Sequence, residues 1–373
     1  MSRLTLGGLR TGSPQTMGAL RLVPVLRDEA PGDLRIGMRD YGPSIGVVVV
    51  EPRIAYLSYV PHGFVVSHTA DGSSAALGAG LGERSEKSFV KIHHRMVKSE
   101  VKEAKGAPER FRMLPLHLAM EGLLALRFRG PDIVWKEYSE HAARFGLSPR
   151  IERSVRGAWL RGFDQALATF EIHPRQVGVL CFVAEAFASA FVVSHPDDYR
   201  RLHLSLLEDF YGDLLYQYAL LHPELPRAET LVDVAGITSI AQLEGEIARV
   251  RDDWREYTAL LADGLFGRDI DTETVRAMKP FTLERFLPKL DPNEECHIGE
   301  RIVRDDGTLE YLKTFRLSHA QVRRAYLLEQ LSLAEWNLDA ASARLSCTKD
   351  ELVTRLVNAG FGYLLRPHLA LIS

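Results

Sequence analysis

The sequence predicts a mixed α+β protein: an N-terminal α+β (mixed α/β) domain, a helical middle segment with a β-hairpin, and a C-terminal all-α segment. Short apolar runs bounded by Gly, Pro and Asp predict strands in the earlier part of the chain. Apolar residues three and four positions apart predict helices in the later part. Helices that follow the strands, without regular alternation, are typical of an α+β arrangement.

Composition limits the classes of protein that the chain can belong to. Its 373 residues are enough for two or three domains, and 46% hydrophobic with 25% charged residues is typical of a globular protein. A net charge of −3 argues against indiscriminate binding to nucleic acid or to membrane surfaces. The three cysteines, Cys181, Cys296 and Cys347, are too scattered for a disulfide framework or a zinc site. We therefore expect a cytoplasmic protein without a signal peptide, a membrane span or a cofactor.

Residues 1–19 are rich in Gly, Ser and Thr and predict a flexible tail. Residues 20–225 form the predicted α+β domain, which ends at the boundary Pro223–Pro226. The strands expected in it are Leu20–Leu26, Val47–Val50, Ile54–Val60, Phe64–His68, Phe111–Leu118, Leu123–Phe128, Val177–Ala184 and Phe187–Val193. Its expected helices are Trp135–Phe145, Arg156–Phe170 and a long one over Asp197–Leu221.

The stretch HPRQVGVLCFVAEAFASAFVVSHPDDYRRLHLSLLEDFYGDLL resembles the ARPP type of prokaryotic domain. The matching features are Gln176-Val177-Gly178 before a strand, a second strand ending near Val193, a His-Pro-Asp turn and the long helix. The resemblance covers Leu20–Leu221 and rests on the order of elements. ARPP domains are named for their genomic association with ADP-ribosylglycohydrolases and rhodanese-like phosphatases. The resemblance therefore implies a role in a bacterial conflict, stress or nucleotide-signalling operon.

The most basic part of the chain, Arg84–Lys105, is a candidate anion-binding stripe. If the segment is helical, its cations line one side and can meet phosphate or an acidic partner. Glutamates between them also fit an ordinary solvated face, so both interpretations stay open. The residues of the stripe are Lys87, Lys91, Arg95, Lys98 and Lys102.

Residues 226–294 predict a helical connector with a seven-residue apolar repeat. Its apolar positions alternate steps of three and four, as on the contact face of paired helices. These are Ile240, Leu243, Ile247, Val250, Trp254, Tyr257 and Leu261. Such a face predicts either a helical pair within the chain or homo-oligomerisation through 240–261. Residues 295–316 then predict a wing-like β-hairpin, with Asp305-Asp306-Gly307 as its turn.

Residues 317–373 predict three helices with a tight turn before the third. Ser318 caps the first helix, which runs to Leu333, and Asn337 caps the second. Thr348 and Glu351 form a capping box at the start of the third. This order is typical of a helix-turn-helix, whose third helix enters a DNA groove.

The line RRAYLLEQLSLAEWNLDAASARLSCTKDELVTRLVNAGF resembles the Fis-type helix-turn-helix of bacterial regulators. The resemblance implies contacts to DNA or a partner from Asn337, Thr348, Lys349, Thr354 and Arg355. Asp350 and Glu351 depart from the family's basic third helix. Seven Lys/Arg against five Asp/Glu from Arg316 onward also make a weak electrostatic attraction for DNA. A module that packs against protein is therefore the competing interpretation.

No catalytic pattern stands out, and the catalytic residues are unknown. The chain lacks His-Glu-x-x-His, Cys-x-x-Cys and Gly-x-Ser-x-Gly. Cys296 and His297 are adjacent in a predicted strand, so their side chains point to opposite faces. We therefore predict a non-catalytic regulator or adaptor of a bacterial conflict or stress (anti-phage) system that binds DNA or a protein of the same operon. The alternatives are an enzyme or sensor for ADP-ribosyl or other phosphorylated nucleotides, and a structural subunit.

Overall fold

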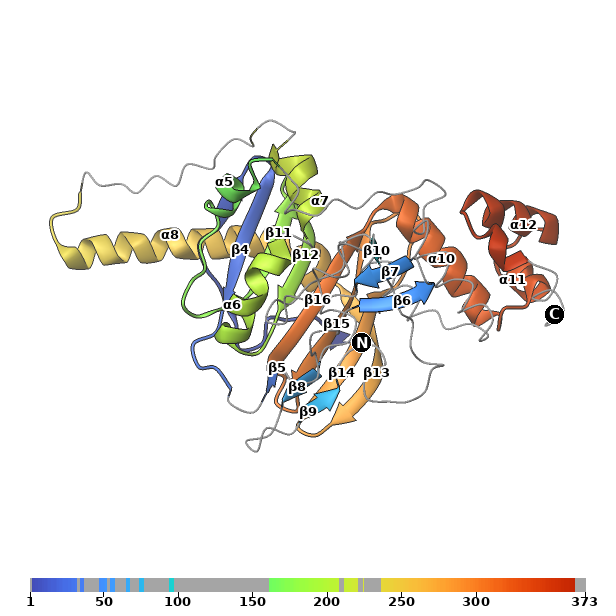
Figure 1. Ribbon diagram of the computed structural model, residues 1–373, viewed down its shortest axis with the longest axis horizontal. Coiled ribbons are helices and arrows are strands. Elements are labelled where there is room, and N and C mark those ends of the chain that lie inside the picture. Colours follow the sequence, from blue (N-terminus) through green and yellow to red (C-terminus); the bar gives the residue numbers. More distant parts are fainter. Residues whose placement is uncertain are drawn as a thin grey trace.

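A ten-stranded antiparallel sheet forms the centre of the molecule (Figure 1). The computed structural model describes residues 2–31, 34–36, 47–51, 54–57, 65–67, 74–76, 94–96, 161–207, 211–220, 224 and 236–365. The strand order is β1-β13-β14-β15-β16-β12-β11-β4-β2, and β3 also pairs with β4. The strands are β1 (Ser2–Arg3), β2 (Arg10–Thr11), β3 (Gln15–Met17), β4 (Leu20–Leu26), β11 (Gln176–Val183), β12 (Ala186–Val192), β13 (Asp269–Met278), β14 (Phe281–Pro288), β15 (Cys296–Arg304) and β16 (Leu309–Leu317).

The prediction of a flexible tail over residues 1–19 is wrong. β2 and β3 pair with β4, and β1 pairs with β13 near the other edge of the sheet. Leu4 and Ala19 are buried, so this segment contributes apolar contacts as well as backbone hydrogen bonds. Composition alone missed this, because strands of two or three residues are stabilised by their pairing partners more than by their own sequence.

The predicted strands Val177–Ala184 and Phe187–Val193 are confirmed and pair as a hairpin, the hairpin predicted over 295–316 is confirmed, and the two hairpins lie side by side in the same sheet. β11 and β12 form the first, β15 and β16 the second, and β12 pairs with β16 so that Ser189 lies opposite Phe315. The second hairpin is therefore part of the central sheet and does not stand beside the terminal helices as a wing.

Six shorter strands form two further antiparallel sheets. One joins β6 (Val47–Glu51), β7 (Ile54–Leu57) and β10 (His94–Met96); the other joins β5 (Arg35–Ile36), β8 (Val65–Ser67) and β9 (Ser74–Ala76). The predicted strands near Val47, Ile54 and Phe64 are confirmed at these places, but they are divided between two sheets. The elements predicted over 111–145 lie outside the described residues.

One face of the central sheet is covered by α5 (Phe163–Leu167), α6 (Pro196–Ser205), α7 (Gly212–Leu214) and the π-helix η5 (Leu215–Leu220). The predicted continuous helix Asp197–Leu221 is therefore wrong, because α6 ends at Ser205 and a new helical segment begins at Gly212. Tyr211, which caps that segment, is fully buried, and its hydroxyl donates to the Ser189 Oγ at 3.3 Å.

The opposite face is covered by the C-terminal end of α8 (Ile240–Leu261) and by α9 (Asp263–Phe266). The helix predicted over 240–261 is confirmed. The helical connector predicted over 226–294 is wrong after α9, because β13 and β14 follow there as strands of the central sheet. Ala262 and Leu265 are buried against the sheet, whereas the N-terminal half of α8 extends past the sheet edge (Figure 1). No helix in the described ranges is both long and apolar enough to cross a membrane.

The chain leaves β16 directly into α10 (His319–Leu333), which leads to α11 (Leu338–Arg344), α12 (Lys349–Asn358) and the 3-10 turn η6 (Gly362–Leu365). The three predicted helices and their caps at Ser318, Asn337 and Thr348 are confirmed. Leu331, Ala341, Leu352, Leu356 and Phe361 pack together, and their cluster continues into the core of the sheet. α11 and α12 lie at the end of α10 that is farthest from the sheet (Figure 1).

Candidate functional site at the terminal helices

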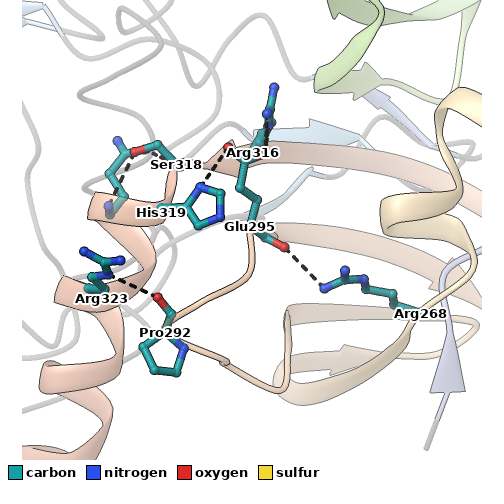
Figure 2. A network of polar contacts seen from close by, with 8 residues as sticks. Arg268, Pro292, Glu295, Arg316, Ser318, His319 and Arg323 are labelled. Atoms are coloured by element: carbon teal, nitrogen blue, oxygen red, sulfur yellow. Dashed lines mark hydrogen bonds and ion pairs between the residues drawn. The ribbon is translucent and has the colours of Figure 1, made fainter.

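A network of polar contacts fixes the first turn of α10 to the sheet, with Glu295 at its centre (Figure 2). Arg316 of β16 donates from both Nε and Nη2 to Oε2 of Glu295, with 2.6 Å between Nε and Oε2. His319 places its Nδ1 3.5 Å from the other carboxylate oxygen. Arg268, which follows α9, donates to the backbone oxygen of Glu295 at 3.2 Å. One loop residue thus connects three elements.

Two further contacts complete this joint. Arg323 donates from Nε to the Pro292 carbonyl at 3.3 Å, one turn further along α10 (Figure 2). Ser318 and Gln321 form a capping box, so the exposed amides of the first turn are hydrogen-bonded. The direction in which α10 leaves the sheet is therefore set by side-chain contacts as well as by the covalent connection to β16.

A cavity of about 430 Å³ lies beside the joint. Phe187 and Leu261 form an apolar wall, and Arg268 and Arg316 line the polar side. His297 also lines it: the imidazole packs against Phe187, with 5.0 Å between ring centroids, and its Nδ1 has no hydrogen-bond partner among the described residues. Burial, with Arg316 and Arg268 nearby, lowers the pKa of His297 to about 3, so the ring is neutral at physiological pH.

The outward surface of α12 carries charges of both signs. Lys349, Asp350, Glu351 and Arg355 are exposed, while Leu352 and Leu356 are buried. Val357 is 53% exposed on the same helix. The surface of α12 is therefore charge-balanced, with an apolar residue among its polar ones.

The five residues predicted to contact DNA or a partner have different roles in the structure. Asn337 and Thr348 are helix caps: the side chain of Asn337 accepts from the Ala340 amide at 2.9 Å, and that of Thr348 from the Glu351 amide at 3.2 Å. Lys349 forms an ion pair of 3.1 Å with Asp339 of α11, and Thr354 donates to the Asp350 carbonyl at 2.9 Å. The fifth, Arg355, is exposed on α12.

The predicted basic stripe is not assembled by the described residues. Lys87, Lys91, Lys98 and Lys102 lie outside them. Arg95 lies in strand β10, opposite Tyr56 of β7, so the stretch is not helical at this point.

Sequence reasoning missed a row of buried charges in the central sheet. Arg285, Glu300 and Lys313 are paired across β14, β15 and β16 and are all buried. Lys313 Nζ lies 3.7 Å from Glu300 Oε2, and Arg285 Nε lies 3.9 Å from Glu300 Oε1. Burial lowers the pKa of Lys313 to about 8, and the nearby Glu300 carboxylate opposes that shift. The sequence did contain a sign of this row: in each of the three strands, a charged residue occupies a position whose neighbours two residues away are apolar and face the core.

The cysteines do not form a reactive site. Burial raises the pKa of the Cys181 thiol well above its usual range and that of Cys296 to about 12, so both stay protonated. Cys296 and His297 face opposite sides of the sheet, as predicted from strand alternation: Cys296 belongs to the core that contains α10, and His297 packs on Phe187. Within the described residues, no three metal-ligating side chains lie together.

Comparison with protein families gives a match to the ARPP-2 family over residues 4–279. Comparisons with curated proteins and with solved structures gave no match. The matched range runs beyond the predicted Leu20–Leu221: it includes β2, β3, α8 and β13, and it ends before β14 and the terminal helices. Because the match covers well over half of the sequence, the chain belongs to the ARPP-2 family.

Proposed function

We propose that this ARPP-2 protein is a non-catalytic adaptor of a bacterial conflict or stress system, and that its terminal helices bind a partner protein. The observation that carries this proposal is the surface of α12, which is exposed, charge-balanced and held away from the sheet on α10. Membership of the ARPP-2 family supports the conflict-system setting. The partner we expect is a protein encoded in the same operon.

Electrostatics favours a protein over DNA as the partner. Binding to DNA draws most of its affinity from Lys and Arg side chains at phosphates. On α12, Asp350 and Glu351 offset Lys349 and Arg355, and Lys349 is already paired with Asp339. Protein interfaces, by contrast, combine apolar residues and arginine, and α12 exposes Val357 and Arg355.

The test is a binding measurement with purified proteins of the neighbouring genes. The double variant Val357→Asp and Arg355→Glu is expected to weaken the complex at least about tenfold, which corresponds to about 1.4 kcal/mol. Leu260→Asp is a matched control, because Leu260 is a 71% exposed apolar residue on a different helix, α8. If the parent protein, the double variant and the Leu260→Asp control bind the partner with equal affinity, the proposal is contradicted.

DNA binding is tested with the same material by gel shift at low salt. The helix-turn-helix interpretation expects a shift that Lys349→Ala and Arg355→Ala together abolish. The protein-partner proposal expects no shift for the intact chain, and a shift that depends on both residues would replace it.

The cavity beside the joint supports a second candidate function, the sensing of a phosphorylated small molecule. Arg268 and Arg316 line the cavity together with Glu294 and Glu295, the carboxylates they pair with, so a phosphate would have to take one of these arginines from its glutamate. The neutral His297 ring, whose Nδ1 has no partner among the described residues, can meet a polar group of the ligand. Thermal-shift measurements with ADP-ribose, AMP and inorganic phosphate test it. Stabilisation that Arg316→Gln and His297→Phe both remove would support sensing, and indifference to all three compounds would exclude it.

A further inference from the structure

The apolar row of α8 is divided into a docked half and an uncovered half. In the docked half, Tyr257 donates its hydroxyl to Glu185 at 2.9 Å, in the turn between β11 and β12. The guanidinium of Arg21 lies 5.4 Å from the ring centroids of both Trp254 and Tyr257 and pairs with Glu185 at 2.6 Å. These contacts attach the C-terminal part of the row to the sheet.

The uncovered half projects past the sheet edge (Figure 1). Ile240, Leu243 and Ile247 continue the same row and are 77%, 40% and 36% exposed. The helix is well formed here, because Ser239 caps it and Gln242 accepts from the Thr238 amide at 2.7 Å. An amphipathic helix usually buries such a row, but in the part of the chain that the structure describes this face of the projecting half is exposed.

The polar side of α8 is occupied by contacts within the helix. Arg249 bonds to Glu246 at 3.0 Å and to Asp253 at 2.9 Å, and Arg255 pairs with Asp252 at 2.8 Å. The uncovered apolar row is therefore the part of this helix that remains available to another molecule.

A second copy of the chain fits this row poorly. In a parallel pair of helices the row continues into Trp254 and Tyr257, which are occupied by Arg21 and Glu185 of the same chain. An antiparallel pair confined to Ile240–Val250 is centred near Gly245. By the heptad pattern it places Glu244 against Glu244 of the other copy, and Glu246 against Glu246. The facing Glu244 side chains repel each other and oppose association, whereas Arg249 partly neutralises each Glu246.

We propose that the projecting half of α8 binds an amphipathic helix of a different protein, with an apolar row flanked by Lys or Arg. The apolar row of that helix would cover Ile240, Leu243 and Ile247. Its cations would meet Glu244 on one side of the row and, on the other side, would compete with Arg249 for Glu246. This docking site lies at the opposite end of the molecule from α12 (Figure 1), so the chain has two separate surfaces for partners.

The experiment measures binding of a fluorescent three-heptad peptide to the full-length protein by anisotropy. The peptide carries Leu at both apolar heptad positions and Lys at both flanking positions, where mutual repulsion keeps it monomeric. A matched peptide has Glu at the flanking positions. The Lys peptide is expected to bind at least about tenfold more tightly than the Glu peptide. Equal binding of the two peptides, or no binding of either, would overturn the proposal.

Two variants locate the site. Leu243→Asp with Ile247→Asp is expected to abolish binding of the Lys peptide without lowering the melting temperature, because both side chains are exposed in the folded chain. Leu260→Asp, elsewhere on α8, is expected to leave binding unchanged. Light scattering of the intact protein is expected to give the monomer mass. A dimer that the double substitution dissociates would show that a second copy covers the row, which contradicts the proposal.

Discussion

Arg316, in strand β16 of the central sheet, donates hydrogen bonds to the Glu295 carboxylate from two guanidinium nitrogens. Both side chains are about two-thirds buried, and Glu295 is also the residue that Arg268 and His319 approach. The pair therefore connects the sheet, the loop before β15 and the first turn of α10. It determines how firmly the terminal helices are held.

Glu295→Gln is expected to loosen this joint. The change removes the charge that faces Arg316 and His319, and for a partly exposed pair the loss is about 1 kcal/mol of unfolding free energy. Denaturant unfolding measures that loss, and hydrogen exchange should become faster in the first turn of α10. Asp269→Asn is the control, because Asp269 pairs with Arg3 where both side chains are more than half exposed. An unchanged exchange rate in α10 would show that Glu295 does not hold the helix.

The protein is expected to lose stability as the pH falls from about 6.5 towards 3. The folded state keeps His297 neutral, with a pKa of about 3, whereas the unfolded chain takes up a proton near 6.5. At pH 5 this single group costs about 2 kcal/mol of unfolding free energy. In His297→Phe the loss between pH 7 and pH 5 should be smaller by that amount. His203, whose pKa burial lowers to about 4, accounts for part of the slope that remains. Parallel pH profiles of the two proteins would contradict this assignment.

Lys313→Met is expected to destabilise the protein by about 3–5 kcal/mol, because it leaves the buried Glu300 without its lysine. The matched variant replaces the whole row, Arg285→Leu, Glu300→Leu and Lys313→Met, and should recover most of that loss, since buried ion groups are often replaceable by apolar residues. The free energy of unfolding in urea, measured for the single and the triple variant, checks both expectations. A single variant as stable as the parent protein would show that Glu300 does not depend on Lys313.

Thr348→Ala is expected to cost about 1 kcal/mol of stability, because Thr348 caps α12 and forms a capping box with Glu351. Arg355→Ala is expected to leave stability within about 0.5 kcal/mol of the parent, as for an exposed surface position. Thermal unfolding separates the two substitutions. Equal melting temperatures of the two variants would contradict the structural role of Thr348.

The sequence predicted correctly those helices and strands that have a regular spacing of apolar residues, a capping residue or a turn motif of their own. The three terminal helices follow from Ser318, Asn337 and Thr348 at their starts, and the β15–β16 hairpin follows from its Asp-Asp-Gly turn. Pairing between distant segments was not predictable in this way. Nothing local indicates that Ser2 and Arg3 pair with Ile270 and Asp269, or that β12 lies next to β16.

The candidate sites show the same division. The Fis-type resemblance implied contacts for Asn337 and Thr348, whereas the residue pattern at the helix starts predicted that they are caps, and the structure shows the cap bonds. The joint around Glu295 combines residues from three separate elements, so no spacing in the sequence indicates it. The uncovered half of α8 was visible as a heptad row. That its second half is docked through Arg21 and Glu185 required the fold.

The most direct test of the adaptor proposal is the affinity of the purified chain for the products of its neighbouring genes, measured with the parent protein and with the Val357→Asp, Arg355→Glu variant. The proposal predicts a complex with one of these proteins that the variant weakens at least about tenfold, while its melting temperature is unchanged. Binding that is equally tight for both forms, or no complex with any of these proteins, would contradict it.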